Sequence, residues 1–375
     1  GLLVDALVPV LGLQGMVRAT LTDIDFHDTL MTGMLGFLLF AGALHVDLDH
    51  LLSRRSAIAT LATVGILLST GLVAVAAYFL TGLTGLDVPF AYCLVFGALI
   101  SPTDPIAVLA ILKQTEVPAS LEAKIAGESL FNDGVGVVLF TILVAIATGG
   151  DGHGAALTPG GIAQLFLTEA VGGTLLGLAG GYVAYRAMRA IDEHNLEVLI
   201  TLALVMGTYA LALRAHVSGP IAMVVAGLFI GNHGTRLAMS ASTRDHVEKF
   251  WSLLDEILNS LLFLAIGFEV FALTITPMTI WIAVVAIPLV LGARFISVSV
   301  PIQTLGRWHD FTPGVIPVLT WGGLRGGISV ALALSLPPSQ VRDSILAATY
   351  GVVVFSIVVQ GLTIERVVRA TVGRR

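Results

Sequence analysis

The chain has 375 residues, of which 56% are hydrophobic and only 12% are charged, and its formal net charge is −6. A soluble domain carries about 25% charged residues, so the composition excludes a soluble globular protein. It predicts an all-α polytopic membrane protein. The single cysteine, Cys93, excludes a disulfide framework within the chain and a cysteine-rich metal site.

Apolar segments follow one another along the whole sequence. About 20 apolar residues cross the hydrocarbon core of a bilayer as a helix, and we count about twelve such segments, of which the first is short. The longest hydrophilic stretch, at about 233–250, is expected to be a loop, so no soluble domain is expected. The segments lie approximately at residues 2–17, 28–48, 56–80, 90–113, 119–148, 160–188, 196–214, 217–232, 254–273, 276–301, 312–337 and 342–365.

The basic residues alternate with these segments. Of the 19 lysines and arginines, most follow an even-numbered segment, including a group after the twelfth, whereas only Arg18, Arg214 and Arg342 follow an odd-numbered one. Because cytoplasmic loops are enriched in Lys and Arg, the even loops and the C-terminus are predicted to be cytoplasmic.

Two segments, one in each half of the chain, contain helix breakers. Residues 101–105 read SPTDP, and residues 321–327 read WGGLRGG. Prolines and clustered glycines interrupt a helix, and irregular backbone at membrane depth persists only where protein or a water-filled cavity covers it. A matched pair of interrupted segments indicates a transporter site built from an inverted repeat.

The fifth segment carries a dense polar stretch, GESLFNDG, at residues 127–134. A charge at the bilayer centre costs about 2.5–3.5 kcal/mol on insertion scales, so these groups need partners, ions or water. Residues four apart share a helix face, which predicts one broad stripe of oxygen-bearing groups. Such hard ligands suit a small hard cation, and a carboxylate in this environment holds either a proton or a cation. The four groups are Glu128, Ser129, Asn132 and Asp133.

These motifs are similar to those of a known family. Residues 100–108, 127–134, 255–269 and 321–327 resemble, in order and at fitting spacing, the NhaP-like sodium/proton antiporters of the cation/proton antiporter-1 family, which are bacterial relatives of the eukaryotic sodium/proton exchangers. The resemblance implies a thirteen-helix inverted-repeat antiporter fold with two crossed, unwound transmembrane helices. Because only about twelve segments are present, we expect the family's first helix to be absent.

The resemblance also implies a division of the single transport unit, residues 1–375. Core ion-binding helices are expected at approximately 56–148 and 254–337. Dimerisation helices are expected at approximately 1–48 and 160–232, and they imply a homodimer.

The resemblance implies roles for individual residues. Asp133 would bind the cation and the proton alternately, and Ser129, Glu128 and Thr103 would help to coordinate Na+. For Glu128 an alternative stays open, namely a buried pair with Arg294 that orders the site.

Further residues would order the site without binding the ion. Arg294 and Arg325 match family arginines near it, and Asp104 would balance the partial charges of helix ends. Asn132 would order the site, and its pairing with Asp133 marks the electroneutral branch of the family.

The resulting expectation is exchange of Na+ or Li+ for H+ across the plasma membrane, electroneutral and one for one, with no cofactor and no nucleic-acid partner. The alternatives are a K+/H+ antiporter on the same scaffold and, further away, a cation channel. An enzyme is not expected, because the sequence has no nucleophile elbow, metal-binding triad or phosphate loop.

Overall fold

The computed structural model describes residues 34–53, 55–86, 88–104, 108, 119–149, 159–235, 238–269, 276–306 and 314–371. Every named element in these ranges is a helix, and the single β-bridge among them is isolated. The predicted all-α class is confirmed. The segment expected at 2–17 lies outside the described residues, as does the start of the segment expected at 28–48.

Six helical stretches of the described chain are long and apolar enough to cross a membrane, and three apolar helices are shorter. Two of the long stretches contain a π-helical turn between two α-helices. In chain order the elements are α4 (Leu35–Leu44), α5 (Leu48–Ser53), α6 (Arg55–Thr60), η2 (Leu61–Gly65), α7 (Ile66–Thr84), α8 (Phe90–Ile100), α10 (Ala119–Ala147), α11 (Pro159–Met188), α12 (His194–Ala215), α13 (Gly219–Phe229), η3 (Ile230–Gly234), α15 (Ala241–Glu269), α16 (Pro277–Leu305), α17 (Val315–Trp321), α18 (Gly327–Leu334), α19 (Gln340–Phe355), η5 (Ser356–Gln360) and α20 (Gly361–Thr371).

The start of α15 corrects one expectation. The stretch at about 233–250 was expected to be a loop, but α15 already begins at Ala241. Hydropathy misses this start because the first turns are polar, yet Ser240 accepts a hydrogen bond from the Thr243 backbone N–H at 3.3 Å, which is an N-cap contact. Pairs of opposite charge four residues apart then stabilise the polar half of the helix: Arg244–Glu248 at 2.7 Å and Lys249–Asp245 at 2.6 Å.

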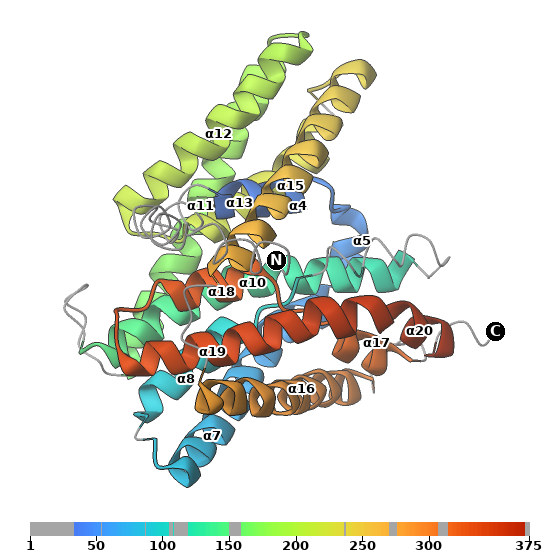
Figure 1. Cartoon of the computed structure of the whole chain (residues 1–375). Coiled ribbons are helices and arrows are strands. Elements are labelled where there is room, and N and C mark those ends of the chain that lie inside the picture. The colour runs from blue at the N-terminus through green and yellow to red at the C-terminus, as the bar shows by residue number, and fades with distance from the viewer. Residues whose placement is uncertain are drawn as a thin grey trace, which may run out of the picture.

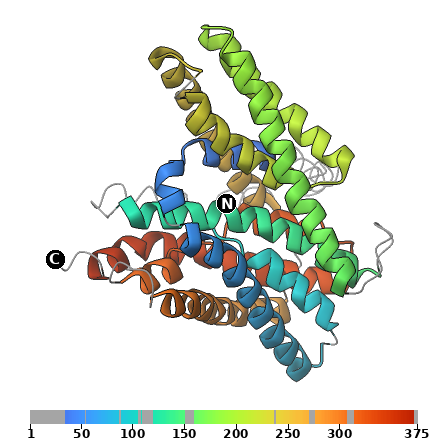
Figure 2. The ribbon, with the colours of Figure 1, turned by 180° about the vertical axis from the view of Figure 1, so that it is seen from behind.

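Two large hydrophobic clusters organise the described helices. The first is formed mainly by α7, α8, α10, α16, α18 and α19, and the second mainly by α4, α11, α12 and α13. In Figure 1, α16 and α19 run across the lower part of the molecule while α12 and α15 rise above it. Figure 2 shows the blue α7 and the cyan α8 side by side from behind.

Two helices bear on the expected division of the chain. The second half of α15, expected among the core helices, contributes Leu262 to the first cluster, whereas its first half contributes Val247 and Trp251 to the second. The helix α19, expected in neither set, contributes Ile345 and Tyr350 to the first cluster. We therefore propose that α19 belongs with the core helices and that α15 links the two groups.

Close packing of α11 against α13 depends on Gly177. A Cβ at this position would lie 2.4 Å from the carbonyl oxygen of Ala222. We expect Gly177→Ala to lower the thermal unfolding midpoint in detergent, since overpacking costs about 1–3 kcal/mol. The matched control is Gly207→Ala in α12, where nothing lies within 4 Å and the midpoint should stay the same or rise. Equal midpoints for the two variants would contradict the close approach.

The two interrupted segments meet through their backbones. The helix α8 ends at Ile100, and residues 322–326 separate α17 from α18. The Asp104 N–H donates to the Leu324 carbonyl oxygen at 2.8 Å, and the two residues form an antiparallel bridge. The predicted crossing of two unwound helices is confirmed.

Candidate ion-binding site

Arg325 holds the end of α8 at this crossing. Its side chain is 2% exposed. Nη1 donates to the carbonyl oxygens of Ser101 and Pro102, the second at 2.8 Å. Ser101 is the C-cap of α8, and the last carbonyls of a helix have no intrahelical donor. The buried guanidinium therefore satisfies one of these carbonyls and the next one along the chain, and it offsets the negative end of the helix dipole.

Thr103 is the point at which α10 reaches the unwound segment after α8. The Ser129 hydroxyl donates to the Thr103 carbonyl oxygen. The Asn132 side chain makes two contacts: Nδ2 donates to Thr103 Oγ1 at 2.9 Å, and Oδ1 accepts from the Thr103 backbone N–H at 3.3 Å. The structure therefore brings together three of the predicted residues, all at most 5% exposed.

Glu128 pairs with Arg294 across two helices. Arg294 Nη1 lies 2.5 Å from Glu128 Oε1, and the two side chains are 8% and 2% exposed. Arg294 Nε and Nη2 also donate to the Leu319 carbonyl oxygen, at 3.2 and 3.1 Å. The contact favours the second of the two interpretations that the sequence left open for Glu128, that of a buried pair.

Asp133 lies one turn along α10 from Ser129 and is only 8% exposed. No hydrogen bond or ion pair from the described residues reaches its carboxylate. The charged groups that act on it are the Asp104 carboxylate and the Arg325 guanidinium. Glu128 is therefore paired with Arg294, whereas the Asp133 carboxylate has no comparable partner in the described part of the chain.

A small cavity adjoins these residues. Its volume is about 10 Å³, and Thr103, Glu128, Ser129 and Arg294 are among its lining residues. This is about the room that one water molecule needs, and therefore also the room for one small dehydrated cation. Asp133 is not among its lining residues.

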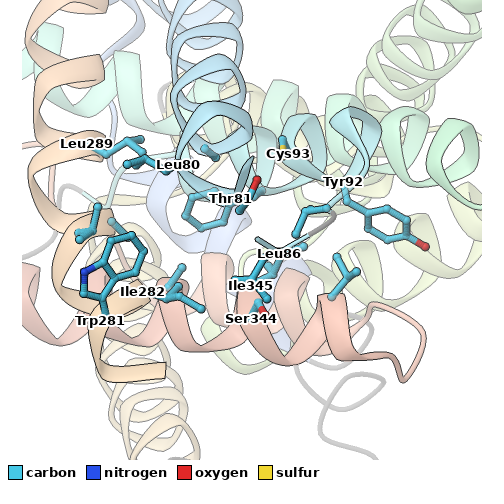
Figure 3. Close-up of a pocket in the computed structure, with 17 residues that line it drawn as sticks. Leu80, Thr81, Leu86, Tyr92, Cys93, Trp281, Ile282, Leu289, Ser344 and Ile345 are labelled. Carbon is cyan, nitrogen blue, oxygen red and sulfur yellow. The ribbon is translucent and has the colours of Figure 1, made fainter. Parts of the chain in front are cut away.

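A larger cavity of about 80 Å³ lies elsewhere, between α7, α8, α16 and α19. Figure 3 shows that its lining is mostly apolar, with Cys93, Leu80, Ile345 and Trp281 among the side chains. Size alone would make it the default ligand site. A cation that loses its water needs oxygen ligands, and none of the predicted site residues lines this cavity.

Gln360 lies outside every motif that the sequence offered for the site. Its side chain is 1% exposed and donates to the Trp321 carbonyl oxygen, at the end of α17. The available signal was a lone amide in the apolar segment at 342–365, because a polar group at membrane depth needs a partner.

Two crossed, interrupted helices with a buried carboxylate beside them define a secondary transporter of small ions. Residues 6–370 match the family described as "Sodium/hydrogen exchanger, transmembrane", and the chain belongs to this family. It is therefore a multi-pass membrane protein.

Relatives agree with this assignment, and a solved structure has a similar fold. The chain is 50% identical to the Na+/H+ antiporter NhaP of Pseudomonas aeruginosa over 96% of its length and 85% of that protein's length. It is 38% identical to the Na+/H+ antiporter NhaH of Halobacillus dabanensis, with 92% and 83% covered. Its fold is similar to that of the sodium proton antiporter MjNhaP1 of Methanocaldococcus jannaschii, with a TM-score of 0.77, 18% identity, and 96% and 88% covered.

Proposed function

We propose that this chain exchanges Na+ for H+ across the plasma membrane by competition of the two ions at Asp133. One observation carries the proposal: a buried carboxylate without a partner among the described residues lies beside an ordered set of oxygen groups at the helix crossing. Membership of the sodium/hydrogen exchanger family supports the same function, as do relatives described as Na+/H+ antiporters.

The proposed coupling follows from the cost of a bare charge in the membrane. Facing one side, the Asp133 carboxylate binds Na+ with help from Ser129 and Thr103. Facing the other side, it exchanges Na+ for H+. Only the neutralised site crosses readily, because an ionised carboxylate without a cation is too costly in the barrier. The movement would be a rocking of the core helices around the site.

Electroneutral exchange, one proton for one cation, fits the charges at the site. Glu128 and Arg294 form a neutral pair that stays together in this structure, so Asp133 is the group expected to change its proton or cation. Asn132, which bonds Thr103 through both ends of its amide, has no charge to contribute.

Two alternatives share the same residues. Ligand oxygens of this kind do not distinguish Na+ or Li+ from K+, so K+/H+ exchange on this scaffold is the first. A cation channel is the second, and a buried carboxylate suits alternating binding better than a selective pore lined by carbonyls. Saturation and transport rate separate a carrier from a channel.

The proposed setting is a homodimer in the plasma membrane with a cytoplasmic C-terminus. The basic residues that follow the last segment support this orientation. Large apolar side chains of α11 are exposed, among them Leu175 at 62% and Val183 at 68%. They require a cover of lipid or of a second copy of the chain, and we propose that the second copy supplies part of it.

The function is tested in liposomes that contain the purified protein, an inside-acid pH gradient and a pH-sensitive dye. Na+, Li+ and K+ are added in turn, with and without a clamped membrane potential. Dissipation by Na+ that is independent of the potential supports electroneutral Na+/H+ exchange. Dissipation by K+ alone would mean that the transported cation is K+ and not Na+. If folded protein does not respond to any of the three cations, antiport is contradicted.

The Thr103 hydroxyl gives a second prediction. Thr103→Val removes the acceptor for Asn132 Nδ2 and leaves a buried amide unsatisfied, which costs about 1–3 kcal/mol. We expect a clearly higher half-saturating Na+ concentration, whereas Thr103→Ser keeps the hydroxyl and stays close to wild type. Thr141→Val, at an exposed hydroxyl of α10, the helix that carries Asn132, is the control. Equal values for the Val and Ser variants would contradict the role of the hydroxyl.

A further inference from the structure

Gln360 occupies an unusual position in the last membrane-spanning stretch. It closes the π-helical turn η5, in which the Gly361 N–H donates to the Ser356 carbonyl oxygen, five residues back. Turns of this kind inside α-helices are rare and occur frequently at functional sites. Ser356 and Gln360 are both 1% exposed.

The Gln360 amide connects this turn to the second interrupted helix. Nε2 donates to the Trp321 carbonyl oxygen at 2.9 Å, and Oε1 accepts from the Ser356 hydroxyl at 2.5 Å. Trp321 is bound a second time, because its Nε1 donates to Thr363 Oγ1 at 2.9 Å. Both contacts fix the last residue of α17 to the stretch that runs from η5 into α20.

Trp321, which these contacts hold, is the last residue of α17 before the interrupted stretch. Residues 322–327 contain four glycines, and glycine leaves the backbone free to adopt many conformations. Within this stretch Leu324 bonds the Asp104 backbone and Arg325 bonds the carbonyls of Ser101 and Pro102. A displacement at Trp321 would therefore pass into the segment that carries Thr103.

Gln360 and Arg325 also face a common cavity. A space of about 10 Å³ is lined by Arg294, Gly323, Arg325, Ser356 and Gln360, among others. Arg325 Nη2 is buried and has no hydrogen-bond partner in the described chain. The space is about large enough for one water molecule, which would give Nη2 an acceptor.

We propose that Gln360 is a positioning residue for the ion-binding site, acting through the Trp321 carbonyl and Arg325 on the crossing that holds Thr103. The inference rests on the proposed exchange of Na+ for H+ and adds a group from the last membrane-spanning stretch to the machinery of that site. Gln360 touches neither the ion cavity nor Asp133. Its effect is therefore on the geometry of ion binding.

The test compares Gln360→Leu and Ser356→Ala with wild type in the liposome assay. Gln360→Leu leaves the Trp321 carbonyl and the Ser356 hydroxyl without this partner, and we expect the half-saturating Na+ concentration to rise about tenfold. Ser356→Ala removes only the contact that orients Gln360, so the half-saturating Na+ concentration should rise by less than in Gln360→Leu. The matched control is Gln340→Leu, an exposed glutamine at the start of the same helical stretch, which should leave half-saturation unchanged.

The maximal rate and the thermal midpoint are measured on the same preparations. A half-saturating Na+ concentration equal to that of wild type in both variants would overturn the proposal, even if the amount of folded protein fell. If Gln360→Leu does not fold, Ser356→Ala decides the question by the presence or absence of the shift. If wild-type protein shows no Na+-dependent proton movement, the proposed function itself is overturned. If the variants are active and their half-saturating Na+ concentration is unchanged, only the role of Gln360 is overturned.

Discussion

Asp133→Asn is expected to reduce Na+-driven proton movement to the level of protein-free liposomes. The amide has nearly the same shape as the carboxylate, but it is neutral at every working pH and binds neither H+ nor Na+ with the strength of a carboxylate. The site can then change sides without an ion, so the coupling of the two fluxes is lost. The measurement is the pH-dye assay with saturating Na+ outside the liposomes.

A binding measurement separates loss of coupling from loss of folding. A ligand that binds only the folded state raises its apparent stability, so Na+ should raise the thermal midpoint of wild-type protein but not that of Asp133→Asn. The control is Asp245→Asn, at an exposed carboxylate paired with Lys249, which should retain both exchange and the Na+ effect. Exchange that persists in Asp133→Asn would contradict the role of Asp133 as the carrier.

Breaking the Glu128–Arg294 pair is expected to have the largest effect on stability. Removal of one partner leaves the other charge buried and unpaired, which costs about 3–5 kcal/mol. Arg294→Met also removes both donors to the Leu319 carbonyl, so its thermal midpoint in detergent should fall furthest. The double variant Glu128→Leu/Arg294→Met leaves no unpaired charge and should recover part of the loss.

The exposed pair of α15 provides the matched control. Arg244 and Glu248 are 2.7 Å apart, close to the 2.5 Å of the buried pair, but their side chains are 52% and 40% exposed. Arg244→Met should lower the midpoint only slightly, because exposed pairs contribute about 0–1 kcal/mol. A double variant at Glu128 and Arg294 that is less stable than both single variants would contradict the argument from an unpaired charge.

Much of the fold could be predicted from the sequence because membrane solvation acts on each segment separately. A helix in lipid satisfies its own backbone hydrogen bonds, so an apolar stretch of the right length predicts a spanning helix without knowledge of its neighbours. Prolines at 102 and 105 and the glycines at 322–327 interrupt their own helices by the same local logic. The prediction was wrong where hydropathy was the only guide, at the polar first turns of α15, which an N-cap and ion pairs stabilise.

For the site, the sequence by itself determined which groups are buried together on α10 and, through the resemblance, the family to which the chain belongs. It did not determine which group meets which. Glu128 and Arg294 are 166 positions apart, Arg325 and Ser101 are 224 apart, and Gln360 meets the carbonyl of Trp321 on another helix. Hydropathy and spacing report on one helix at a time, whereas these pairings depend on how helices pack and where their unwound ends cross. Only the tertiary structure therefore decided that Arg294 pairs with Glu128, that Arg325 donates to the carbonyls of Ser101 and Pro102, and that no hydrogen bond or ion pair from the described residues reaches the Asp133 carboxylate.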